Sequence, residues 1–415
     1  AAPTVFFEDD FGLYQILGLL NSKVSITILQ ILNPTLSTPP RYVRSIPTNN
    51  KIFSNVDNVI IKHNIFISKS DWDSRETSWD FEENPLIAQQ AASLQAAFNA
   101  WQKKVTADFY QLHANEEELN RIFIEIYGLQ EELTPDVPLR DITILQDELK
   151  GDDLDAIEDA FRAGEQPELP IQRDIVMQQF ISYLIGTMLG RYRLDKPGLH
   201  IAHPNPTDEE LAAYHVERAA IPFTMTIDDD AIVPLMGDAC AFPDDAVKQV
   251  QNLVHKLWGD ASQVDNMNFI NECLGMKLDK WMTEKFWAEH ISGRMYKKKP
   301  IYWMFCSNPR FPHRSAFRVL VYMHRMDQFT VQNILRKYLH PHMSHIKSQY
   351  EELTARELEL SRDEMKTREM LQKQISELNE YEEKLKHYAN QQISFDLDDG
   401  VSVNYAKFEG VVAKI

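Results

Sequence analysis

The sequence predicts a mainly helical α+β fold built from several parts. Apolar residues recur every three or four positions in two long stretches, which is the periodicity of amphipathic helices. Two short runs between residues 301 and 323 are rich in β-branched and aromatic residues, which favours strands. A chain of 415 residues exceeds what one hydrophobic core normally holds, so we expect two or three subdomains.

The N-terminal part combines helical and irregular signals. The strongly apolar residues 11–20, FGLYQILGLL, predict a short buried helix. The ITILQIL run that follows, with its Asn33-Pro34 turn, is typical of a compact α+β segment. Asn84 and Pro85 suit the cap and the first position of a helix. A stripe after them predicts a core-facing amphipathic helix and comprises Leu94, Phe98, Trp101, Val105, Phe109 and Leu112.

The middle of the chain is acidic and interrupted by proline. Residues 131–170 hold four prolines and predict a surface-exposed connection with short helical pieces. A second helix is predicted from about Asp174 to Gly190, because one face collects apolar side chains. These are Met177, Phe180, Ile181, Leu184 and Met188.

The C-terminal part predicts two strands followed by a long helix. Ile301–Cys306 and Phe317–Met323 predict strands joined by a basic loop that contains proline. From about Ser344 to Gln392 there is almost no helix breaker, and leucines at 371, 378 and 385 repeat every seven residues. This heptad repeat, the predicted seam, is too short to form a stable coiled coil by itself. We therefore expect this helix to pack against another helix of the same chain. Asp396–Ile415 predicts a turn and a strand-like tail.

Charge is strongly segregated along the sequence. The formal net charge is −19, which taken alone argues against a nucleic-acid partner. Residues 116–170, however, hold 17 acids and 4 bases, whereas residues 291–350 hold 11 bases and one acid, Asp327. Salt screens charges beyond about 8–10 Å, so DNA responds to the local field rather than to the total charge. We therefore expect the basic region to contact double-stranded DNA.

The expected DNA-binding residues surround the two predicted strands. Lys and Arg neutralise phosphates, and Arg also reads guanine edges. The set comprises Arg294, Lys297, Lys298, Lys299, Tyr302, Trp303, Arg310, Arg314, Arg318 and Arg325. The alternative is a solvated surface whose long side-chain stems cover apolar area, with Arg318 as a paired charge on a strand.

Several segments resemble one known family. The block YKKKPIYWMFCS…AFRVLVYMHR, Tyr296–Arg325, resembles the C-terminal region of the PglX-type adenine-specific DNA methyltransferases of BREX phage-defence systems. Phe180–Leu199, Thr226–Leu235 and Leu397–Ile415 are similar to further segments of that family. The opening GLLNSKV…LNPTL…SIP resembles the closing part of its target-recognition region.

The resemblance implies a recognition and clamp part of an enzyme that transfers a methyl group from S-adenosylmethionine to adenine N6. The methyltransferase core precedes this region in the family, so we expect S-adenosylmethionine to bind outside this chain, and we expect no cofactor or metal within it. The chain lacks an initiator Met, which also suggests a piece of a longer protein. The implied division is residues 1–70 as the end of the target-recognition region, 71–170 as a helical segment with the acidic connection, 171–343 as an α+β domain with the basic strand pair, 344–392 as a long helix and 393–415 as a tail.

The residues themselves predict no adenine-methylation motif. Such a site needs an Asn/Asp-Pro-Pro-aromatic turn to hold the flipped base, and the nearest sequence is Asn308-Pro309-Arg310-Phe311. Two alternative functions remain open. Residues 116–170 and the 344–392 helix would suit a protein-interaction scaffold that docks other phage-defence subunits. Asp136, Glu148 and Lys150, beside a strand at residues 142–145, would suit a magnesium-dependent nuclease.

Cysteine and histidine usage adds no metal site to these expectations. Cys240, Cys273 and Cys306 lie far apart, as expected of free thiols in a reducing cytoplasm. The histidines at 340, 342 and 345 are interpreted as ordinary side chains at the start of a helix. No stretch approaches the roughly 20 apolar residues of a membrane span, and no signal peptide precedes the chain, so we expect a cytoplasmic protein without a membrane partner.

Overall fold

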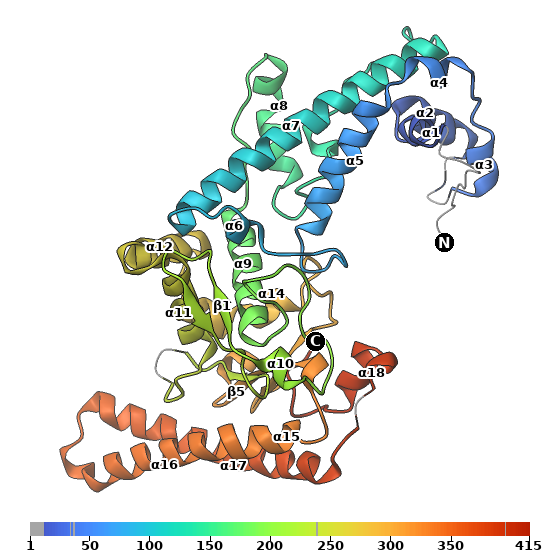
Figure 1. The fold of residues 1–415 in the computed structure, drawn as a ribbon. Coiled ribbons are helices and arrows are strands. Elements are labelled where there is room, and N and C mark those ends of the chain that lie inside the picture. Colours follow the sequence, from blue (N-terminus) through green and yellow to red (C-terminus); the bar gives the residue numbers. More distant parts are fainter. Residues whose placement is uncertain (1–11, 34, 36–37, 238–239, 395) are drawn as a thin grey trace. The chain divides into compact units, whose positions relative to one another are not determined.

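The computed structural model describes residues 12–33, 35, 38–237, 240–394 and 396–415, which form two compact units. The first unit comprises Ala1–Asp73 and Ala100–Gln172, and the second comprises Ser74–Asn99 and Arg173–Ile415. Each unit therefore uses two separate stretches of sequence. Figure 1 shows the elements, and each unit is described by itself below.

The first unit is helical throughout its described residues. Its elements are α1 (Leu13–Leu20), α2 (Lys23–Leu32), α3 (Pro40–Arg44), α4 (Lys51–Asn55), α5 (Asn58–Asp73), the greater part of α7 (Leu94–Tyr127), the 3-10 turn η1 (Leu139–Asp141) and α8 (Gly151–Arg162). Its core collects apolar residues of α1, α2, α4, α5 and α7, among them Leu19, Val24, Ile52, Ile61 and Phe123. The predicted buried helix at 11–20 is thus confirmed over Leu13–Leu20, and residue 11 lies outside the described residues.

Two expectations for the first unit are wrong. The ITILQIL run forms helix α2, begun by Ser22, whose side chain accepts a hydrogen bond from Ser25 N, so this segment is not α+β. Residues 142–145 form no strand, which removes the element that the nuclease alternative needed. The apolar signal was read correctly at both places, but apolar runs of this length do not distinguish helix, strand and buried loop.

No single described helix is long and apolar enough to cross a membrane. Helices α1 and α2 reach the required length and composition only as a pair, and that pair is bent by 63° at the break between them.

The second unit mixes helices with two small antiparallel sheets. Its helices are α6 (Pro85–Ala88), the start of α7, α9 (Arg173–Met188), α10 (Asp208–Leu211), α11 (Ala246–Trp258), α12 (Asp260–Leu274), α13 (Leu278–Glu284), α14 (Phe286–His290), α15 (Thr330–Asn333), α16 (His340–Ala355), α17 (Arg362–Gln391) and α18 (Val401–Ala406). Its strands are β1 (Tyr214–Val216), β2 (Phe223–Met225), β3 (Ile232–Pro234), β4 (Tyr302–Cys306) and β5 (Arg318–Tyr322). Shorter turns are η2 (Pro312–Arg314), η3 (Met323–Arg325), the π-turn η4 (Ile334–Leu339), η5 (Glu357–Glu359) and η6 (Leu397–Asp399).

The predicted strand pair forms the centre of a buried three-stranded sheet. The strand order is β3-β5-β4, and both pairings are antiparallel, with Met304 opposite Leu320 and Val233 opposite Leu320 from the other side. Every residue of β4 and β5 is buried, because both faces of the sheet are covered. The backbone N–H of Cys306 donates to Val411 O, and that of Ala413 donates to Met304 O, so the last residues extend the sheet beyond β4.

The predicted long helix is a helical hairpin. Helix α16 ends at Ala355 and helix α17 begins at Arg362, and the two helices lie side by side (Figure 1). Ser361 and Glu364 form a reciprocal capping box that starts α17. The leucines of the predicted seam, Leu371, Leu378 and Leu385, are buried, in agreement with the expected packing against other helices of the chain. The tail contains the short elements η6 and α18, followed by the turn at 407–411 and a bridge between Val412 and Phe305 of β4.

Helix α9 is buried on all sides and anchors the second unit. Nearly every residue from Ile175 to Met188 is buried, so the predicted helix is confirmed but it presents no solvent face. Gly186 lets the β4 tyrosine approach this helix, because a Cβ there would lie 2.5 Å from Tyr302 Oη and 2.7 Å from Tyr192 Cδ2. Both tyrosine side chains are fully buried, so neither can move into solvent to make space.

We expect Gly186→Ala to destabilise the protein, although alanine is normally the better helix former by about 1 kcal/mol. Overpacking against two fixed aromatic rings costs about 1–3 kcal/mol, which outweighs the gain in helix propensity. Urea unfolding measures the difference. Gly293→Ala is the matched control, because a Cβ there meets nothing within 4 Å, and it should change stability by less than about 0.5 kcal/mol.

Candidate nucleic-acid interface

Four of the ten expected DNA-binding residues lie inside the protein. Tyr302 and Trp303 are 0% exposed, and Arg318 and Arg325 are each 6% exposed. A side chain without exposed atoms contacts no DNA on a folded surface, so the assignment of these four residues to the interface is corrected. The basic and aromatic residues around the strand pair suggested an exposed surface, but β4 and β5 are covered on both faces.

The two buried arginines hold loops together through backbone carbonyls. Arg325 Nη1 donates to Leu189 O at 3.0 Å and to Asp228 O at 2.8 Å, and its Nη2 donates to Asp229 O at 2.8 Å. Arg318 Nη1 donates to Thr283 O at 2.6 Å. Burial lowers the pKa of both guanidinium groups, but these carbonyls compensate for part of the lost hydration. Arg318 contacts backbone carbonyls and has no ion pair among the described residues, so its interpretation as a paired charge on a strand is not borne out.

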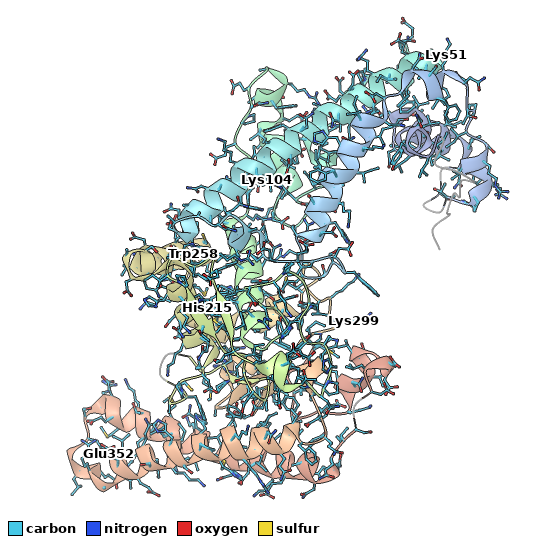
Figure 2. The ribbon with its side chains drawn as sticks, viewed as in Figure 1. Lys51, Lys104, His215, Trp258, Lys299 and Glu352 are labelled. Carbon is cyan, nitrogen blue, oxygen red and sulfur yellow. The ribbon has the colours of Figure 1, made fainter. Side chains whose placement is uncertain are left out.

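Three lysines at the start of β4 form the first exposed cationic group. Lys297, Lys298 and Lys299 are exposed, and none has an ion pair with the described residues. Figure 2 shows Lys299 at the outer edge of the second unit. The φ angles of Lys297 and Lys298 are 43° and 60°, a region that residues other than glycine rarely adopt. The neighbouring Arg294 differs, since it pairs with Glu289 at 3.1 Å.

The lysine turn is held in this unusual conformation by its backbone and by a buried tyrosine. Lys297 N donates to Ser292 O at 2.8 Å, and Lys298 N donates to Ile291 O at 3.0 Å. Between them and α14, Tyr296 accepts a hydrogen bond from Arg191 Nη1 at 2.9 Å and donates to Glu76 Oε2 at 3.2 Å. The surrounding structure therefore fixes the backbone from which the three ammonium groups project.

The loop after β4 carries the second exposed cationic group. Arg310 and Arg314 place their guanidinium groups 5.2 and 5.4 Å from the centre of the Phe311 ring, which is 41% exposed. Phe311 N donates to Asn308 Oδ1 at 3.2 Å, which closes the turn. Sequence reasoning left Phe311 out, although an aromatic residue between two arginines in a loop was the available signal.

The two cationic groups lie at opposite ends of β4. The lysines precede the strand, and Arg310 and Arg314 follow it. Five residues at about 3.3 Å each give the strand between the two groups a length of about 17 Å. The expected single basic patch is therefore divided into two smaller groups, and its middle is part of the core.

The remaining basic and acidic residues near the sheet neutralise one another. Asp228, Asp229 and Asp230 lie close enough to share a cation. Lys337 Nζ already lies 2.7 Å from Asp230 Oδ2 and 3.8 Å from Asp229 Oδ2, and Tyr338 donates to Asp230. We therefore assign no metal to this cluster.

The histidines of the predicted helix start are also engaged within the fold. His342 is buried with Nε2 2.9 Å from Ala316 O, and His340 Nε2 lies 2.9 Å from Glu382 Oε1. These contacts agree with their interpretation as ordinary side chains.

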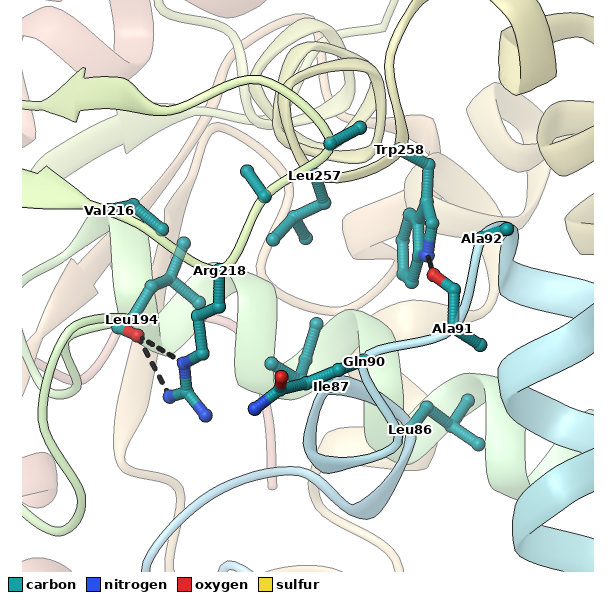
Figure 3. A pocket seen from close by; sticks show the side chains of 12 residues that line it. Leu86, Ile87, Gln90, Ala91, Ala92, Leu194, Val216, Arg218, Leu257 and Trp258 are labelled. Atoms are coloured by element: carbon teal, nitrogen blue, oxygen red, sulfur yellow. Dashed lines mark hydrogen bonds between the residues drawn. The ribbon is translucent and has the colours of Figure 1, made fainter.

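The second unit also contains a mainly apolar cavity of about 490 Å³ (Figure 3). Leu86, Ile87, Leu257 and Trp258 form much of its wall. The one charged side chain there, Arg218, is already used, since it donates twice to Leu194 O and pairs with Glu83 at 2.6 Å. No carboxylate is among the lining residues described, so the cavity offers no polar set for the sugar of a nucleoside cofactor, and we assign no ligand to it.

Two curated proteins are similar to nearly the whole chain. Adenine-specific methyltransferase BrxX of Escherichia coli O9:H4 (strain HS) is 33% identical over 433 aligned positions, which cover 99% of this chain and 34% of that protein. Adenine-specific methyltransferase PglX of Lacticaseibacillus casei (strain Zhang) is 33% identical over 424 positions, which cover 97% of this chain and 32% of that protein. The chain thus spans about a third of the length of these relatives. No family model matches it.

We expect acid to destabilise the second unit through His290, which is buried behind the lysine turn. Its Nε2 accepts a hydrogen bond from Tyr302 N at 3.1 Å, and burial together with Arg191 lowers its pKa to about 3. The unfolded chain takes up this proton below pH 6.5 and the folded protein does not, so stability falls as pH drops from 6.5 towards 3, by about 1.4 kcal/mol per unit.

His290→Gln retains an acceptor for Tyr302 N and should lose less stability between pH 7 and pH 5 in urea unfolding. The raised pKa of buried Glu76 acts in the opposite direction, but it is present in both proteins and cancels from the comparison. His345→Gln, at an exposed position of α16, should behave as the parent does. Equal acid sensitivity of parent and His290→Gln would exclude His290 as the cause.

Proposed function

We propose, from its homology to adenine-specific methyltransferases of the BrxX and PglX type, that this chain is the DNA-recognition and clamp part of such an enzyme. Methyl transfer from S-adenosylmethionine then takes place in another part of the parent protein, which acts in phage defence. The observation that carries the proposal beyond homology is the pair of exposed, unpaired cationic groups at the two ends of β4.

The chemistry of the two groups suits phosphates rather than acidic side chains. The three lysines present compact point charges from a fixed turn, and Arg310 and Arg314 present planar guanidinium groups at the tip of a loop. A separation of about 17 Å is roughly half of the 34–36 Å helical turn of B-DNA. The two groups can therefore contact phosphates about half a turn apart along one duplex.

Phe311 adds an apolar surface to this interface. Its ring is stacked between guanidinium groups at the tip of the β4–β5 loop, and it is partly exposed. Aromatic rings in such positions pack on sugars or on unstacked bases, with energies of about 1–3 kcal/mol per base. In the proposed clamp, Phe311 makes the one close contact that is not electrostatic.

The net charge of −19 limits how tightly this chain alone holds DNA. The two cationic groups attract the duplex, while the excess of acidic residues in the rest of the chain repels it. Binding is therefore weak and strongly salt-dependent, and in the parent protein it adds to contacts made elsewhere.

Charge reversal tests the proposal. The triple change of Lys297, Lys298 and Lys299 to Glu should weaken binding to a DNA duplex at least about tenfold at low salt. Each lost phosphate contact should also lower the slope of log affinity against log salt by about 0.9. Arg310→Glu with Arg314→Glu should act in the same direction. Fluorescence anisotropy between 50 and 200 mM salt, about the range in which such contacts matter, measures both.

The matched control changes Lys51, Lys103 and Lys384 to Glu. These exposed lysines have no ion pair with described residues, and the control alters the net charge by the same amount without touching either cationic group. An equal loss of affinity in the control and in the lysine-turn variant would mean that total charge, not the interface, determines binding. If the lysine-turn variant binds the duplex as tightly as the parent does, Lys297–Lys299 have no role in DNA binding.

A further inference from the structure

The first unit contains an open groove among its helices. About 550 Å³ lies between α1 and α2 on one side and α5, α7 and the segment 137–143 on the others. Helix α5 contributes Ile61, Asn64, Ile65 and Ser68, which share one face. Three apolar side chains at the rim, Leu17, Ile26 and Ile65, are 38%, 46% and 38% exposed. Isoleucine and leucine side chains that line a groove and remain exposed are characteristic of a binding surface.

A carboxylate lies where α7 should be apolar. Phe109, Leu112, Leu119 and Phe123 are buried along one stripe of α7, and Glu116 occupies the intervening position of that stripe. Among the described residues, the Glu116 carboxylate has no hydrogen bond and no ion pair. Asp141, a second carboxylate without an ion pair among the described residues, also lines the groove. So does Lys23, whose Nζ donates to the backbone carbonyl of Asp136.

Such a carboxylate is costly for the fold. Burial, with a smaller contribution from Asp141, raises the pKa of Glu116 to about 7. A half-buried carboxyl group without a hydrogen-bond partner lowers stability, whereas leucine at this position would continue the core. A cation delivered by a binding partner would satisfy both carboxylates at once.

We infer that the α1–α5–α7 groove binds a helix of a partner protein that has an apolar face and carries one lysine or arginine. The apolar rim receives the face, and Glu116 and Asp141 receive the cation. The lining favours a helix, since three helices form an elongated wall of the kind that holds amphipathic helices. The two carboxylates exclude DNA phosphates from the same groove. This inference is independent of the DNA-binding proposal, because it uses residues of the first unit alone.

A stability measurement tests the unpaired carboxylate. The folded protein holds a proton on Glu116 up to about pH 7, whereas the unfolded chain releases it near pH 4.5, so stability contributed by this residue falls as pH rises between these values. Glu116→Gln should therefore raise the urea midpoint at pH 8 and change it much less at pH 5. An unchanged or lower midpoint at pH 8 would mean that the carboxylate is already satisfied, and the inference would fail.

A binding measurement with two defined peptides tests the partner chemistry. The probes are fluorescent Leu- and Ala-rich helical peptides of about 15 residues, one with lysine at the centre of its apolar face and its twin with norleucine there. The lysine peptide should bind the full chain about tenfold more tightly. In the variant Glu116→Gln with Asp141→Asn, the preference should fall to about twofold or less, while binding of the norleucine peptide persists.

Two controls separate the charge from the apolar rim. Glu118→Gln changes a carboxylate two positions along α7, on a different face and paired with Arg121, and should keep the tenfold preference. Ile26→Asp should weaken both peptides alike. Equal binding of the twins, no binding of either, or a preference that survives in the double variant would each overturn the inference. If the parent chain sediments with phosphatidylcholine vesicles and the Ile26→Asp variant does not, the apolar rim binds a lipid surface. This outcome would also overturn the inference.

Discussion

The second unit depends on a buried carboxylate that is shared between distant segments. Glu76 accepts hydrogen bonds from Ser182 at 2.6 Å and from Tyr296 at 3.2 Å, and Arg191 donates both to Tyr296 and to Glu76 O. Residues 76, 191 and 296 are thereby fixed against one another, with α9 on one side and the lysine turn on the other. Loss of Arg191 would remove the positive charge close to the buried Glu76, and loss of Ser182 or Tyr296 would remove one of its hydrogen bonds. Inside the protein, either loss is more costly than the loss of a surface ion pair. The cationic turn is rigid because this network lies behind it.

Helical periodicity and strand composition together identified most of the regular elements of the fold. Helix α7 was predictable because its apolar residues follow the helical repeat, and the pair β4–β5 because both runs are rich in β-branched and aromatic residues. The break between α16 and α17 was missed because residues 356–361 are ordinary helix formers, and only the Ser361–Glu364 cap marks the new start. Burial on both faces of the β4–β5 pair was not predictable, since the covering side chains, such as His290 against Tyr302 and Tyr405 against Trp303, come from other segments. For the same reason, Tyr302 and Trp303 looked like exposed aromatics of an interface.

Segregation of charge in the sequence is only partly preserved in space. The basic stretch 291–350 is neutralised locally by the acidic residues 228–230, which the β3–β5 pairing brings close to Lys337 and Arg325. Lys297–Lys299, Arg310 and Arg314, at the two ends of one strand, are among the basic residues that stay exposed, and such a subset cannot be chosen from residue counts. The acidic stretch 116–170 behaves in the same way, since Arg162 pairs with Glu117 and Glu158 while Glu116 stays unpaired. In both regions the functional candidates are the charges that the fold leaves without partners.

The residues that run beside β4 have a consequence for handling this protein. Val411 and Ala413 occupy the hydrogen-bonding edge of β4, which would otherwise present free amide and carbonyl groups along an apolar strand. An uncovered edge of that composition is a template for pairing between molecules and for aggregation. Removing residues 411–415 would uncover this edge, so a variant that lacks them should aggregate more readily than the chain that retains them.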